Sequence, residues 1–472
     1  MSVVLVVLLV ISLYLTITLL LGVYGYKVSK KSVSDYFLAD RKIGSLVMFF
    51  TLAATNFSAF TFLGFAGAAY HLGYAFYGVM AFGTSFMALS FYIIGRKVWR
   101  LGKKHGYISP SELIGKETGS RPLQILFFSV MVIFTLPYLA IQPMSAGYVL
   151  SALTDGAIPY FWGAAFLTFF IILYVFLGGM RTIAWTDVLQ GLMMVSLLLV
   201  SVAVIATNLG GLEAAHSQAR LVDPGLFARE GKITVGIMFS YTVLWSLCDP
   251  MFPQLFQRFF IPKSEKGLKR ASVAYPLMVS LLFLLPVVIG VMGRGAIPNL
   301  VGQESDSILP LVLDETAPKW LAALIMSGGF AAFMSTADSQ LLTMSSMFTR
   351  DIFHPIVDKV KSDDYSVGHV MVVVLALAGL AIAYRPPATI FTIVTWAFTG
   401  LAILYPVTLA VLYWDVDPRA CIASIVTGLI MLIAYNFEML PTFGLLPAIT
   451  IVSVSSFVLF VIHYVLKRMK KV

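Results

Sequence analysis

Thirteen stretches of about 20 mostly apolar residues follow one another along the chain, and this pattern constrains the fold more than any other feature. A helix needs roughly 20 apolar residues to cross the hydrocarbon core of a bilayer. Only 12% of the 472 residues are charged, whereas soluble proteins carry about 25%. We therefore expect an all-α polytopic membrane protein in which residues 1–472 form a single membrane domain. The predicted spans are 3–25, 45–70, 77–96, 124–152, 160–178, 187–207, 235–257, 273–293, 320–348, 367–384, 388–413, 420–437 and 446–466.

Lysine and arginine predict the orientation of these spans. The first stretch is too long for a signal peptide and no basic segment precedes it, so we expect it to be retained. With the N-terminus outside, 26 of the 32 basic residues fall in cytoplasmic segments, as the positive-inside rule requires. The other six are Arg220, Arg229, Lys232, Arg294, Lys319 and Arg385. We therefore expect a multi-pass plasma-membrane protein with a cytoplasmic C-terminus, and we read the net charge of +9 as an orientation signal rather than a nucleic-acid footprint.

Three aspartates, Asp187, Asp249 and Asp338, fall inside or near the ends of predicted spans. Ionisable residues within a membrane are costly and usually functional. Basic residues are missing from the middle of every span, although Arg181 and Arg258 lie near inner span ends and could reach one of the aspartates. The carboxylates are therefore expected either to hold a mobile cation or proton, or to be structural aspartates satisfied by hydrogen bonds or arginine.

Two predicted spans contain residues that interrupt a helix. The second span carries polar Asn56 among small residues, and the seventh carries Pro250 directly after Asp249, with Pro253 three residues further on. Proline removes a backbone donor and clashes with the preceding turn. Transporters use discontinuous helices of this kind to bind cations and substrate groups. Because the breaks are five spans apart, they fit an inverted five-plus-five repeat; the alternative is a pair of packing kinks.

The ninth span presents a row of small and hydroxyl residues. Ala332, Ser335, Thr336 and Ser339 recur at helical spacing and therefore share one face. Hydroxyl and carbonyl oxygens suit a weakly held monovalent cation. The alternative is helix packing through serine and threonine, and the neighbouring Asp338 favours the cation interpretation.

Other functional classes lack their signatures in this sequence. The six histidines form no metal-spaced pair, and there is no glycine-rich phosphate loop ending in lysine. We therefore expect neither an enzyme nor an ATP-driven pump. A channel would typically show filter loops or charged rings, so it remains a weaker alternative than a carrier.

Three motifs give the chain a resemblance to a known family. They are Asp35-Tyr36-Phe37-Leu38-Ala39-Asp40-Arg41, then 178–190 (GGMRTIAWTDVLQ), then 334–342 (MSTADSQLL). With their order and the thirteen-span topology, the chain resembles the sodium:solute symporters, which include proline, pantothenate, monocarboxylate, sialic-acid and sodium–glucose symporters.

The resemblance implies a LeuT-like fold and a sodium site. One extra helix would precede an inverted-repeat core at about 45–413, with repeats at about 45–207 and 235–413, and two helices would follow. Sodium would lie between the second and ninth spans. Its ligands would be the carbonyls of Ala54, Phe57 and Ala332 and the hydroxyls of Ser335 and Thr336.

The resemblance also implies a second cation or proton site and a substrate pocket. The second site would use Asp187, Asp338 and Ser339, although a carboxylate at 338 departs from relatives that carry a hydroxyl there. The pocket candidates are Asn56, Ser58, Phe60, Gln142, Trp245, Asp249 and Trp396. An anionic Asp249 disfavours a bare carboxylate substrate unless a cation or an amino group offsets it.

We therefore predict a sodium-coupled symporter that imports a small organic solute, such as an amino acid or a small monocarboxylate, by alternating access. It is expected to function as a monomer in the bilayer with no nucleic-acid partner. The alternative is a proton-coupled or sodium-independent carrier of the same fold, in which Asp187 and Asp338 hold protons.

Overall fold

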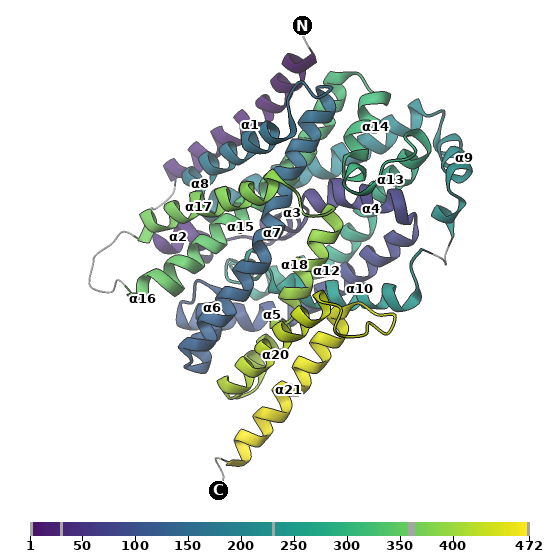
Figure 1. Ribbon diagram of the computed structural model, residues 1–472. Helices are drawn as coiled ribbons and strands as arrows, with labels where there is room; N and C mark the ends of the chain where they lie inside the picture. The colour runs from purple at the N-terminus through teal and green to yellow at the C-terminus, as the bar shows by residue number, and fades with distance from the viewer. Residues whose placement is uncertain (1–2, 29–31, 229–231, 357–363, 470–472) are drawn as a thin grey trace.

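The computed structural model describes residues 3–28, 32–228, 232–356 and 364–469, and the regular secondary structure within these ranges is helical (Figure 1). The α-helices are α1 (Val3–Val28), α2 (Val33–Leu38), α3 (Ser45–Asn56), α4 (Phe65–Leu72), α5 (Ala75–His105), α6 (Pro110–Thr118), α7 (Arg121–Leu153), α8 (Tyr160–Asn208), α9 (Leu212–Val222), α10 (Val235–Cys248), α11 (Pro253–Arg258), α12 (Glu265–Leu282), α13 (Leu284–Ala296), α14 (Ile308–Thr316), α15 (Lys319–Met347), α16 (His354–Ile356), α17 (Asp364–Tyr384), α18 (Ile390–Ala402), α19 (Leu404–Tyr413), α20 (Pro418–Asn436) and α21 (Pro447–Met469). Shorter 3-10 or π segments are η1 (Ala39–Arg41), η2 (Phe60–Gly64), η3 (Pro224–Phe227), η4 (Asp249–Met251), η5 (Gly302–Ser307) and η6 (Phe348–Phe353).

The thirteen predicted spans all coincide with helical segments. In the described residues, ten helices are long and apolar enough to cross a membrane, and the count is eleven if the bent pair Ser45–Asn56 and Phe60–Leu72 forms one span. The remaining two predictions fall on shorter pieces, namely the apolar helix Tyr160–Phe176 and the broken run of α10, η4 and α11. The connections 208–234 and 294–319 carry the short helices α9 and α14.

Helix α15 forms the centre of the molecule. It packs against α8, α7, α1 and α3. In the most apolar 18-residue stretch of this helical segment, 83% of the residues are buried. A helix surrounded by protein on all sides presents its polar residues to neighbouring helices rather than to lipid. At the C-terminal end of the chain, α20 and α21 pack against each other and extend away from the central bundle (Figure 1).

Both helix-breaking segments interrupt their helices where the sequence predicts. Helix α3 ends at Asn56, and its continuation from Phe60 is bent by 61°. Helix α10 ends at Cys248; the 3-10 segment η4 then begins at Asp249 with Pro250 in its first turn, and α11 begins at Pro253. Phe252 between them is extended, as expected for a residue that precedes proline.

Helix α8 contains a turn that separates two predicted spans. Gly179 has φ +60°, a conformation that favours glycine. A Cβ at this position would also lie 2.6 Å from a ring carbon of Tyr36. The close approach of α2 and the positive φ both explain a glycine at the junction of the spans 160–178 and 187–207.

Candidate functional site

The predicted sodium ligands converge between α3 and α15. The Ser335 hydroxyl donates to the Ala54 carbonyl at 2.9 Å and lies 3.1 Å from the Ala332 carbonyl. The Thr336 hydroxyl lies 3.3 Å from the Phe57 carbonyl and 3.2 Å from that of Thr55. Carbonyls near Asn56 are available because the last carbonyls of a helix have no intrahelical partner. The result is a fully buried cluster of neutral oxygens.

This oxygen cluster fits a monovalent cation better than a resident transition metal. Hard cations prefer oxygen ligands, and neutral oxygens hold a singly charged ion without trapping it. In the part of the chain that the structure describes, three or more His, Cys, Asp or Glu residues nowhere gather as a metal site. The ion would bridge the break in α3 and the central helix α15.

A second buried cluster lies on the same face of α15 and contains charged groups. The Arg258 guanidinium, with 0% exposure, lies 3.3 Å from the Asp187 carboxylate and donates to the Ser339 hydroxyl at 2.6 Å. Ser339 in turn donates to Asp338 at 3.1 Å, and Thr51 donates to Asp187. The three residues predicted as a second cation or proton site are therefore brought together, with an arginine already among them.

The charge of this second cluster is not balanced. Asp187 and Asp338 supply two carboxylates and Arg258 supplies one cation. One oxygen of each carboxylate, Oδ1 of Asp187 and Oδ2 of Asp338, is buried without a hydrogen-bond partner among the described residues. Buried polar atoms normally have partners, and Nη1 of Arg258 in the same cluster also has none among the described residues.

The predicted substrate pocket forms beside the two helix breaks. Asn56, Phe60, Trp245 and Asp249 line a small cavity of about 20 Å³. The other lining side chains come from neighbouring helices; they are Thr61, Phe65, Met80, Thr84, Tyr138, Phe283 and Phe398. A cavity of this size holds about one water molecule, so a solute would require the surrounding rings to move apart.

Three predicted pocket residues have other positions. Trp396 lies on the outer side of α18, with 47% of its surface exposed, and Phe398 occupies the pocket instead. Gln142 is fully buried behind the pocket, where its side-chain oxygen accepts from the backbone N–H of Ala59 at 3.1 Å. Ser58 contacts the pocket only indirectly, through a 2.8 Å hydrogen bond to the Tyr138 hydroxyl.

Comparison with known proteins shows the family to which this chain belongs. Residues 36–428 match the model of the Sodium:solute symporter family. The chain belongs to the sodium:solute symporter family.

Relatives of this symporter support the same conclusion along most of its length. It is 25% identical to the sodium/pantothenate symporter of Haemophilus influenzae over 428 residues, which cover 88% of this chain and 87% of the relative. It is also 25% identical to a sodium/proline symporter of Staphylococcus aureus over 437 residues, which cover 90% and 85% of the two chains. Sodium is therefore the coupling ion, and sodium-coupled solute symport is the class of activity.

Solved structures confirm the LeuT-like fold of the symporter. A Na⁺-coupled sialic acid symporter in a substrate-bound outward-open state superposes with a TM-score of 0.80 at 19% identity, covering 97% of this chain and 98% of that chain. MhsT in complex with L-phenylalanine superposes with a TM-score of 0.56 at 13% identity, covering 88% and 97%. At these identities the likeness shows the fold alone.

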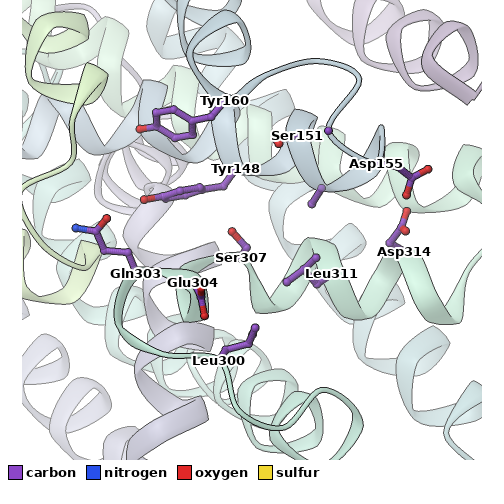
Figure 2. A pocket seen from close by; sticks show the side chains of 12 residues that line it. Tyr148, Ser151, Asp155, Tyr160, Leu300, Gln303, Glu304, Ser307, Leu311 and Asp314 are labelled. Carbon is purple, nitrogen blue, oxygen red and sulfur yellow. The ribbon is translucent and has the colours of Figure 1, made fainter.

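The symporter also has a larger cavity that the sequence did not indicate. It measures about 710 Å³ and lies between α7, α8, η5 and α14 (Figure 2). Figure 2 shows Tyr148 and Tyr160 at one end and Asp155 with Asp314 at the other. Lys319 donates to both of these carboxylates, at 3.1 Å to Asp155. The predicted ion ligands and pocket residues do not line this cavity.

The residues missed in the sequence are three aromatic residues on α7, α12 and α18. Tyr138 and Phe398 line the small cavity, and Tyr275 lies behind it, where its hydroxyl accepts a hydrogen bond from Asn56. Each is an aromatic residue in an apolar helix, where packing alone accounts for its presence. The spacing of these residues gave no signal that distinguished them from core residues.

Proposed function

We propose that this symporter imports a small organic solute by alternating access, driven by sodium bound between α3 and α15. The single observation that supports this proposal best is the convergence of the Ser335 and Thr336 hydroxyls on the carbonyls of Ala54 and Phe57. Binding at these oxygens would satisfy the carbonyls freed by the break in α3.

The position of Asn56 supports a direct link between ion and solute. Asn56 lies between the carbonyls of Thr55 and Phe57, and its side chain reaches Asp249 at 3.5 Å across the pocket. Sodium would fix the backbone of this segment and thereby orient the Asn56 amide toward the solute. Ordering a binding site with one ligand before the second arrives produces positive coupling between the two.

We also propose a plasma-membrane location with the N-terminus outside and the C-terminus in the cytoplasm. The distribution of 26 of 32 basic residues on one side supports this orientation.

Transport by the purified protein tests the proposal. Proteoliposomes with an inward sodium gradient are expected to accumulate one solute from a panel of amines, amino acids, short monocarboxylates and sugars. Collapse of the sodium gradient is expected to abolish this accumulation. Accumulation driven by a proton gradient in the absence of sodium would contradict the sodium assignment and favour the proton-coupled alternative.

The second cluster supports the proposal of a second sodium ion. Two carboxylates against one guanidinium leave one net negative charge in a buried site, with two unpartnered oxygens. A monovalent cation near Asp187, Asp338 and Ser339 would neutralise that charge. The proposed stoichiometry is therefore two sodium ions per solute.

The variant Asp338→Asn is expected to reduce the stoichiometry from two sodium ions to one, because the cluster then becomes neutral without a further cation. Charge-to-solute ratios measured by reversal potential in proteoliposomes check this expectation. Asp314→Asn, which changes a carboxylate paired with Lys319 in the larger cavity, is the matched control. An unchanged ratio in Asp338→Asn would assign Asp338 a structural role.

A further inference from the structure

We propose that the solute carries an ammonium group and that Asp249, together with a cage of aromatic rings, binds this group. This inference rests on the proposed function, because it specifies the solute of the same pocket. The aromatic cage consists of Phe60, Tyr138, Trp245, Phe252 and Phe398.

The carboxylate of Asp249 is the first support for this proposal. It is only 3% exposed, at the point where α10 breaks. Its contacts are the Asn56 amide at 3.5 Å and the Cys248 thiol at 3.6 Å, both long and both to neutral groups. In the described ranges it takes part in no salt bridge, and no Lys, Arg or His lines the cavity. A carboxylate buried at membrane depth without a cation costs several kcal/mol, so a cation from outside the protein is its natural partner.

The aromatic cage is the second support. The Phe398 ring centroid lies 4.5 Å from that of Trp245, 4.7 Å from that of Phe252 and 5.7 Å from that of Tyr138. Phe60 completes the group at 6.1 Å from Trp245. The faces of aromatic rings carry partial negative charge and attract ammonium groups, most strongly where water is excluded. An acidic side chain beside such rings favours a cation over a neutral solute of the same shape.

Backbone hydrogen bonds in the pocket argue against an anionic solute. In discontinuous helices, free N–H groups at a half-helix N-terminus receive substrate carboxylates. Here the first N–H groups after the break already have acceptors: that of Ala59 donates to Gln142 at 3.1 Å, and that of Phe60 to the Ser58 hydroxyl at 3.1 Å. The Thr61 N–H donates to the Ser58 carbonyl at 3.0 Å. A carboxylate would meet Asp249 without these donors to compensate.

A pair of isosteric probes separates the effect of solute charge on binding from the effect of solute shape. Choline and 3,3-dimethyl-1-butanol differ mainly in the positive charge, and methylammonium, glycine betaine, lactate and glucose extend the panel. Binding is measured in saturating sodium as the increase in thermal unfolding temperature of the purified full-length protein. At least one ammonium compound is expected to stabilise the protein, whereas dimethylbutanol, lactate and glucose are not.

Matched variants locate the binding group. Asp249→Asn is expected to weaken binding of the ammonium probe by roughly tenfold or more, and Asp249→Glu to retain part of it. Phe398→Leu is expected to weaken binding, whereas Trp396→Leu, on the outer side of the same helix, is the control and is expected to leave it unchanged.

Stabilisation by lactate or glucose with no response to any ammonium compound would overturn the proposal, as would unchanged binding of the ammonium probe in Asp249→Asn. The effect of sodium in the absence of any solute shows whether the solute class or the proposed function is wrong. If sodium stabilises the protein in the absence of solute and no amine binds, only the solute class is wrong. If sodium has no effect on stability or uptake, the sodium-coupled mechanism itself is wrong.

Discussion

Replacing Ser335 and Thr336 together with alanine is expected to raise the sodium concentration for half-maximal uptake by about 30-fold, if each hydroxyl contributes about 1 kcal/mol to ion binding. Both hydroxyls lie within 3.3 Å of carbonyls of the broken helix. Removing them leaves those carbonyls with fewer partners and deprives the ion of two of its five proposed ligands. The measurement is the sodium dependence of initial uptake rates in proteoliposomes.

The control for this double variant is Ser345→Ala. Ser345 is also fully buried in α15, but its hydroxyl donates to the carbonyl of Leu342 within its own helix. Its replacement is expected to leave the sodium dependence unchanged. The maximal rate of the double variant at saturating sodium is expected to recover substantially, because the two hydroxyls are proposed to bind the ion and do not line the small cavity. An unchanged half-saturating concentration would show that sodium binds elsewhere.

Helical periodicity made the shared face of three proposed sodium ligands predictable from the sequence. The spacing of Ala332, Ser335 and Thr336 places them on one face of any helix, and a polar residue at 56 marks the end of the opposing helix. Proline at 250 and 253 likewise breaks α10 for local steric reasons. Features that depend on local chemistry were therefore predictable: the helix breaks are confirmed, and the residues proposed as ion ligands lie close together.

Features that depend on helix rotation and packing were harder to predict from the sequence. Trp396 and Phe398 are two residues apart, which places them on nearly opposite faces of a helix. Composition gave no basis to choose between them, and the pocket contains Phe398. Similarly, the sequence allowed either Arg181 or Arg258 to approach an intramembrane aspartate. Only packing of α11 against α3 and α15 determines that Arg258 contacts Asp187, while Arg181 pairs with Asp35.

Replacing Arg258 with methionine is expected to destabilise the protein by about 3–5 kcal/mol, the usual cost of removing one partner from a buried ion pair. The guanidinium contacts Asp187, Ser339 and Thr51, and all of these groups are fully buried. Without it, two carboxylates face each other with no positive charge from the protein. The measurement is the thermal unfolding temperature in detergent at fixed sodium concentration.

A double-variant cycle shows whether the destabilisation comes from charge. Arg258→Met combined with Asp187→Asn restores the net charge of the original cluster, so the pair is expected to be more stable than Arg258→Met alone. Arg100→Met, which removes a partly exposed pair with Glu265, is the control and is expected to cost no more than about 1 kcal/mol. Strictly additive losses in the cycle would show that Arg258 stabilises the fold by packing alone. Recovery in the double variant would show that Arg258 neutralises carboxylates that otherwise require mobile cations, and would link the stability of this region to the ions that the protein carries.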